Sequence, residues 1–135
     1  MRLIEDYLPP VKEDGIRTSK ALGYGTGAGS SVTQTTNRST GVTINALSGT
    51  ITTDTTSLAA EGSADFIVTN SKVEIGDVVV LSIQSGENSG GTILSVQDVA
   101  DGSFTIRVHN GNVAAGTAET GAILINFAVI KAVSS

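Results

Sequence analysis

The glycine-rich stretch LGYGTGAGSSV, residues 22–32, has the spacing that comes nearest to a known chemical motif. Gly23, Gly25 and Ala28 satisfy the relaxed G-x-G-x-x-A form of the dinucleotide-binding fingerprint. That fingerprint requires a buried strand before it and, after it, a helix whose first N–H groups hold the phosphates. The flanking segments VKEDGIRTSKA and SSVTQTTNRST are typical of neither element, and the lysine of a P-loop is missing. The sequence therefore predicts a hinge here and not a phosphate site.

Side chains that could catalyse a reaction are scarce in the rest of the chain. His109 is the only histidine, and it stands at the end of a predicted strand, where a hydrogen-bonded turn residue is expected. The pairs Asp98/Asp101 and Glu74/Asp77 flank predicted turns, where carboxylates usually cap or solubilise. The oxygens around the first pair could hold Ca²⁺, but the EF-hand spacing is missing, and the chain contains no cysteine. We expect no enzyme activity, no catalytic residue, no metal site and no cofactor.

The composition predicts one acidic domain with a thin core. The 135 residues are 39% hydrophobic but only 4% aromatic, so the core must consist of Val, Ile, Leu and Ala. The formal net charge of −5 argues against a nucleic-acid partner, because a phosphate backbone requires a basic surface. The sequence holds no apolar run long enough to span a bilayer, so we expect no membrane partner either.

Residues 1–31 are predicted to form an extended N-terminal arm that ends in a glycine-rich hinge. Both prolines of the chain lie in this arm, where their fixed φ favours an extended path. Its apolar side chains are too scattered to close a core, so we expect them to dock on another surface. The predicted docking residues are Leu3, Ile4, Tyr7, Leu8, Pro9, Pro10 and Val11. The predicted hinge residues are Gly23, Gly25, Gly27 and Gly29.

Residues 32–135 are predicted to form an all-β body. Short apolar or alternating runs end in Gly, Asn, Asp or Ser at intervals of about 8 to 12 residues, which is typical of a sandwich or barrel. The expected strands are 41–45, 49–53, 64–70, 76–84, 91–99, 102–109 and 121–130. About seven strands in this length predict an antiparallel β-sandwich or a small barrel-like fold.

The last two predicted strands have distinct patterns. In 102–109 the residues Phe104, Ile106 and Val108 fall on one face, as in a half-buried strand. The run 121–130 adds apolar residues to both faces, which indicates a central strand or a subunit contact.

Turn residues are also predicted from the sequence. Asp101-Gly102 and Asn110-Gly111 are expected to close tight hairpins, and SGENSGG at 85–91 is expected to be a longer mobile tip. Helix is expected only as a turn near 57–62.

Four sequence blocks, in this order, carry a resemblance to a known family. They are GYGTGAG, TGVTIN, FIVTNS and INFAVI. The set resembles small structural proteins of tailed bacteriophages and prophages, the capsid decoration or cement proteins, over roughly residues 22–133. The resemblance implies a role on the virion surface without enzyme activity.

From this resemblance we expect a cement protein on the outside of the phage head. The body would form a homo-oligomer, with a homotrimer expected, while the arm clamps neighbouring subunits of the major capsid protein. The protein would be made in the host cytoplasm and reside on the capsid surface. The alternative is a tail-fibre, receptor-binding or adhesion module whose loops, such as SGENSGG, contact host glycan.

Overall fold

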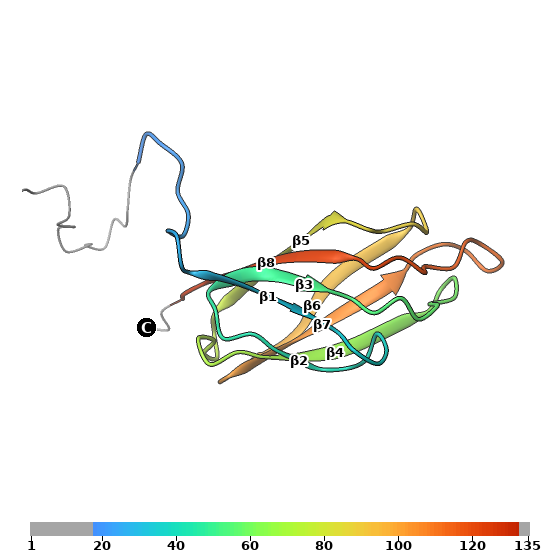
Figure 1. Ribbon diagram of the computed structural model, residues 1–135, viewed down its shortest axis with the longest axis horizontal. Coiled ribbons are helices and arrows are strands. Elements are labelled where there is room, and N and C mark those ends of the chain that lie inside the picture. The colour runs from blue at the N-terminus through green and yellow to red at the C-terminus, as the bar shows by residue number, and fades with distance from the viewer. Residues whose placement is uncertain (1–17, 133–135) are drawn as a thin grey trace, which may run out of the picture.

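The computed structural model describes residues 18–132, which form two four-stranded sheets packed face to face (Figure 1). Sheet A has the strand order β1-β3-β8-β5, and sheet B has the order β2-β4-β7-β6. The strands are β1 (Gly29–Thr33), β2 (Val42–Thr43), β3 (Ser48–Thr52), β4 (Ser63–Thr69), β5 (Val78–Ser85), β6 (Thr92–Ala100), β7 (Ser103–Asn110) and β8 (Leu124–Ile130). The predicted all-β class and the sandwich are confirmed.

The pairing is antiparallel at the centre of each sheet and parallel at one edge. β8 pairs antiparallel with β3 and β5, and β7 pairs antiparallel with β4 and β6. β1 runs parallel to β3, and β2 runs parallel to β4. Each parallel pair is connected through a strand of the opposite sheet, because a parallel neighbour requires a crossover and not a hairpin. The prediction of a purely antiparallel sandwich missed these two edge pairs.

The core lies between the sheets and is built from alternate residues. Phe104, Ile106 and Val108 of β7 are buried, as the alternation predicts, and they face residues of β8 such as Phe127. The rings of Phe104 and Phe127 have centroids 5.6 Å apart and planes tilted by 52°, so an aromatic pair links the two sheets. The prediction of a central position for 121–130 is also confirmed, since β8 lies between β3 and β5.

The structure has one strand that was not predicted, β1, and one that is shorter than predicted, β2. β1 falls in the Ser/Thr-rich stretch that was expected to be part of the hinge. Only two residues of the expected strand 41–45 pair, as β2. The segment 57–62, expected to hold a helical turn, has a non-helical turn at residues 60–61, closed by a hydrogen bond from the Gly62 amide to the Ala59 carbonyl at 2.9 Å. Leu58 of this segment bridges Glu119 across the end of the sandwich. No helix long and apolar enough to cross a bilayer occurs within residues 18–132.

The two predicted hairpin turns have different outcomes. Asp101-Gly102 joins β6 to β7, and Gly102 has a φ of +82°, as a tight turn requires. The prediction for Asn110-Gly111 is wrong, because β7 and β8 belong to different sheets. The side-chain amide of Asn110 is buried and donates hydrogen bonds to the carbonyls of Leu58 and Thr117 at 3.1 and 2.9 Å. Asn110 therefore fastens the loop after β7 and closes no hairpin.

Candidate functional site

The predicted docking residues of the arm lie outside the part of the chain that the structure describes. They are Leu3, Ile4, Tyr7, Leu8, Pro9, Pro10 and Val11. Their role therefore stays a prediction. Within the described part, the buried apolar side chains of the core all fall between Val42 and Val129.

The glycine-rich segment is exposed and leads from Thr18 to the edge of sheet A (Figure 1). A turn at residues 26–27 is closed by a hydrogen bond from the amide of Ala28 to the carbonyl of Gly25 at 3.2 Å. The Tyr24 hydroxyl donates to the carbonyl of Val129 and so fastens the segment to β8. Gly23, Gly25 and Gly27 lie in this exposed segment before the sheet, and their role as a hinge stays a prediction.

The hinge prediction needs one correction. Gly29 is the first residue of β1 and pairs with Ser48 of β3 in the parallel ladder. Pairing within a sheet restricts the backbone dihedral angles of Gly29, so a hinge must lie before this residue. The body accordingly begins three residues earlier than the predicted boundary at residue 32.

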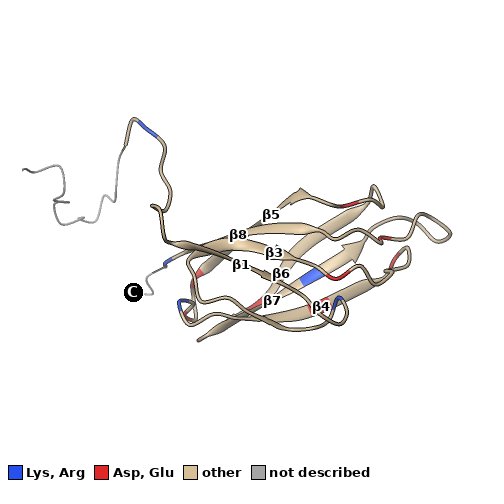
Figure 2. Cartoon of the chain, viewed as in Figure 1, with Lys and Arg blue, Asp and Glu red and all other residues tan. Residues whose placement is uncertain are grey.

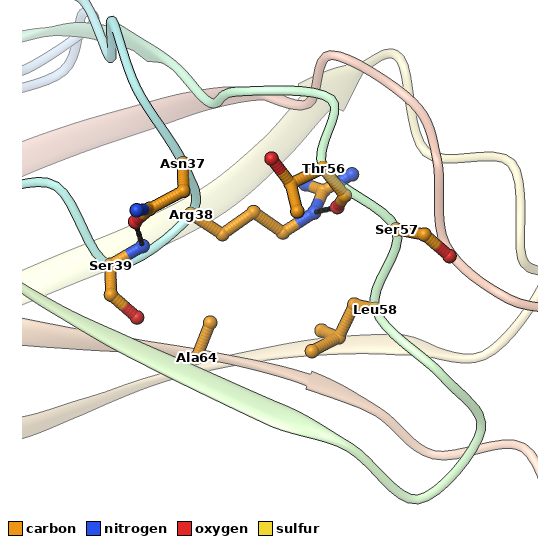
Figure 3. A pocket seen from close by; sticks show the side chains of 7 residues that line it. All are labelled: Asn37, Arg38, Ser39, Thr56, Ser57, Leu58 and Ala64. Atoms are coloured by element: carbon orange, nitrogen blue, oxygen red, sulfur yellow. Dashed lines mark hydrogen bonds between the residues drawn. The ribbon is translucent and has the colours of Figure 1, made fainter.

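A surface pocket of about 300 Å³ lies at one end of the sandwich (Figure 3). The Arg38 side chain extends across it from the loop after β1 toward the carbonyl of Thr56. The pocket is lined by Asn37, Arg38, Ser39, Thr56, Ser57, Leu58 and Ala64. Hydroxyl and amide groups form one side of this pocket and two aliphatic side chains form the other, which suits weak polar contacts better than a charged ligand.

The Arg38 guanidinium makes four hydrogen bonds within the chain. Its Nε donates to the Thr56 carbonyl at 2.5 Å, and its Nη1 donates to the Thr53 hydroxyl at 3.1 Å. Its Nη2 donates to the carbonyls of Glu119 and Gly121 at 3.3 and 2.9 Å. Burial lowers the pKa of Arg38, while the negative charges of Glu119 and Asp54 oppose that shift. Arg38 therefore joins three loops and leaves little donor capacity for a ligand.

Glu119 is the second buried ionic group at this end of the sandwich. Its carboxylate accepts hydrogen bonds from the amides of Asn88, Ser89 and Gly121 and from the Thr92 hydroxyl. Burial acts to raise the pKa of Glu119, but these hydrogen bonds stabilise the anion more strongly and lower the pKa below its usual value. The loop 85–91, predicted to be a mobile tip, is thus fastened to Glu119 by its backbone.

The remaining candidate catalytic groups are also satisfied locally. His109 Nδ1 lies 2.9 Å from the Ser63 hydroxyl on the neighbouring strand. Asp101 accepts the amide of Ile75 at 2.8 Å, so its carboxylate joins the β6–β7 turn to a loop 26 residues away in the sequence. Among residues 18–132 no three His, Cys, Asp or Glu side chains gather as metal ligands would.

Sheet A has an unusual surface, because its four strands contain no Asp, Glu, Lys, Arg or His. In Figure 2 the segments coloured as acidic or basic residues lie in loops, at the ends of strands and on sheet B, while the strands of sheet A have no such colour. Sheet B carries the ion pair between Asp65 and Arg107, with both N···O distances at 2.7 Å. The strands of sheet A thus present a surface without charged strand residues, in contrast to sheet B.

Comparison with known proteins found no matching family model, no matching curated protein and no matching solved structure. Sequence reasoning missed the roles of Arg38 and Glu119, which are 81 residues apart and meet only in the folded chain. Each stands alone among small or polar residues, Arg38 between Asn37 and Ser39 and Glu119 before Thr120, so no periodic pattern could have identified either one.

Proposed function

We propose that this protein is a virion structural protein of a tailed bacteriophage, a decoration or cement protein that binds the outside of the head. In this proposal several copies of the β body sit on the capsid, and the arms clamp neighbouring subunits of the major capsid protein. A ligand that binds only the assembled shell stabilises it by RT ln(1 + [L]/Kd), about 2.7 kcal/mol per site at a hundredfold excess over Kd.

One observation carries the proposal: residues 18–28, the described part of the chain before β1, form an exposed segment outside the core. The Tyr24 side chain fastens this segment to the body through the carbonyl of Val129. The rigid part of the molecule is thus presented at the end of a tether, and a clamp needs that division between body and tether. Three exposed glycines, at positions 23, 25 and 27, precede the sheet and suit a change of direction.

The test is binding to expanded, undecorated heads of the phage or prophage that encodes the protein. Co-sedimentation should recover the full chain with the heads, and removing residues 2–17 should abolish that recovery. In the full-length chain, the double variant Ile4→Asp, Leu8→Asp should weaken binding at least tenfold, because charged side chains cannot enter apolar pockets. The matched control Ser19→Asp adds a charge to an exposed residue and should bind like the wild type.

Two results would overturn the proposal. Undiminished head binding by the shortened chain would show that the arm is not the clamp, provided that its far-UV spectrum and melting temperature match the full chain. Binding to host cells in place of heads would favour the alternative, a tail-fibre or receptor-binding module.

A further inference from the structure

β5 is an edge strand without the usual protection. It spans eight residues, Val78–Ser85, pairs only with β8 in its sheet, and has the sequence VVVLSIQS without a charge or a proline. An edge strand exposes unpaired N–H and C=O groups, and most proteins protect it with charges, bulges or short length. The bulge in β5 falls after Ile83, so the strand is regular before that point.

The edge strands of sheet B show the protection that β5 lacks. β2 contains only two residues, which is too short to recruit a partner strand. β6 carries Asp98 and a bulge between Val96 and Asp98, in the middle of the strand. The difference between β5 and β6 indicates that the β5 edge is covered in the working form of the protein.

The outer face beside this edge is apolar. Val78 pairs with Ile130 of β8, and Val80 pairs with Ala128, so these side chains lie together on one face. Val78, Val80 and Ile130 are 51%, 48% and 54% exposed. We call Val78, Val80, Ile130 and the free edge of β5 the β5 patch. Burying three half-exposed aliphatic side chains favours association.

The charge distribution indicates what covers the β5 patch. The chain has a net charge of −5, so two copies repel each other wherever their acidic surfaces meet. Sheet A contributes no acidic strand residue to such a contact, whereas sheet B presents Asp65 and Asp98. The charges next to the patch are paired, since Lys131 lies 2.6 Å from Asp77 and 3.3 Å from Glu74. The strands of the β5 patch therefore bring no acidic residue of their own into a contact between copies of this chain.

We infer that the β5 patch is the surface through which a second copy of this chain binds, with the free edge of β5 meeting the partner's backbone. The inference rests on the proposed function for its biological meaning, since a clamp with several arms needs several copies. Three features of the molecule support it: the free edge of β5, the exposed aliphatic side chains beside that edge, and the absence of charged residues from the strands of sheet A.

The test is the mass of the full-length protein in solution, measured by sedimentation equilibrium over micromolar concentrations. The wild type should be a concentration-dependent oligomer of the 13.7 kDa chain. Val80→Glu should raise its dissociation constant by about a hundredfold, because it places an unpaired charge in an apolar contact. Ile93→Glu is the matched control, since Ile93 is 57% exposed on the other long edge strand, β6, and its substitution should leave the mass unchanged.

A second measurement needs no substitution. In hydrogen–deuterium exchange of the wild type, the amides of β5 should be protected at high concentration and exchange faster on dilution below the dissociation constant. A monomeric wild type, an undiminished mass for a folded Val80→Glu variant, or exchange of β5 that ignores concentration would each overturn the inference. Head binding is assayed separately, so a monomer that still binds heads would overturn this inference but not the proposed function.

Discussion

Glu119 shows how a single buried carboxylate can organise loops that are distant in sequence. Its side chain is completely buried, and its oxygens accept three backbone amides and one hydroxyl. Arg38 reaches the same region through the backbone carbonyls of Glu119 and Gly121. Burying a charge without partners lowers the stability of the folded state by several kcal/mol. The hydrogen bonds to Glu119 offset this cost, and they hold the ends of the loops in place.

Replacing Glu119 by Gln should reveal this contribution as a pH-dependent loss of stability. The amide cannot accept hydrogen bonds with both terminal atoms, so a buried donor is left unpaired and we expect a loss of about 1–3 kcal/mol at pH 7. The pKa of Glu119 is lowered below 4.5 in the folded chain, so its stabilisation is present above the unfolded pKa and is lost as the pH falls through the folded pKa.

The measurement is the free energy of unfolding in urea at several pH values. The difference between the wild type and Glu119→Gln should be full at pH 6–7 and should shrink as the pH falls below about 4. Other carboxylates with lowered pKa values, such as Asp77 beside Lys131, remain in both proteins and cancel in the comparison. A difference independent of pH would mean that the charge of Glu119 does not contribute.

At the scale of elements, the sequence predicts strands from short apolar or alternating runs bounded by turn residues. β4, β7 and β8 have an alternating buried pattern, and their positions follow from period two alone. β1 has no such signal, because GSSVT contains one aliphatic residue and is held by its pairing with β3. The candidate pocket could not be predicted for the same reason, since its residues come from loops that only the packed sheets bring together.

Substituting two glycines by alanine distinguishes the cost of a left-handed backbone conformation from the cost of a steric clash. Gly86 and Gly102 have φ values of +87° and +82°, where a side chain is strained. A Cβ at Gly102 would meet no atom within 4 Å, but a Cβ at Gly86 would lie 1.9 Å from the Ala122 carbonyl oxygen. Gly102→Ala should therefore cost about 1 kcal/mol, the cost of the left-handed conformation.

Gly86→Ala should cost about 3 kcal/mol or more, because the backbone at the end of the β5–β8 pair must also move apart. Urea unfolding followed by far-UV circular dichroism measures both values. Equal losses for the two variants would show that the approach of Gly86 to Ala122 is not a tight constraint.

At the scale of the whole molecule, one core joins the two sheets. The buried side chains of β4 and β7 pack against those of β3 and β8 in a single cluster, without a disulfide to support it. Small aliphatic residues dominate this cluster, so its few aromatic rings contribute a large share of the buried apolar area. The sheets should therefore unfold together, with equal calorimetric and van't Hoff enthalpies.

The contact between Phe104 and Phe127 is the place to measure how strongly the two sheets depend on each other. Phe104 belongs to β7 and Phe127 to β8, and their ring centroids lie 5.6 Å apart. Each Phe→Leu substitution should lower the free energy of unfolding by about 1–2 kcal/mol, through lost area and a small cavity. Because the two substitutions share one contact, the double variant should lose about 0.5–1.5 kcal/mol less than the two single losses combined. Strict additivity, or two separate transitions on heating, would contradict a core in which each sheet is stabilised by the other.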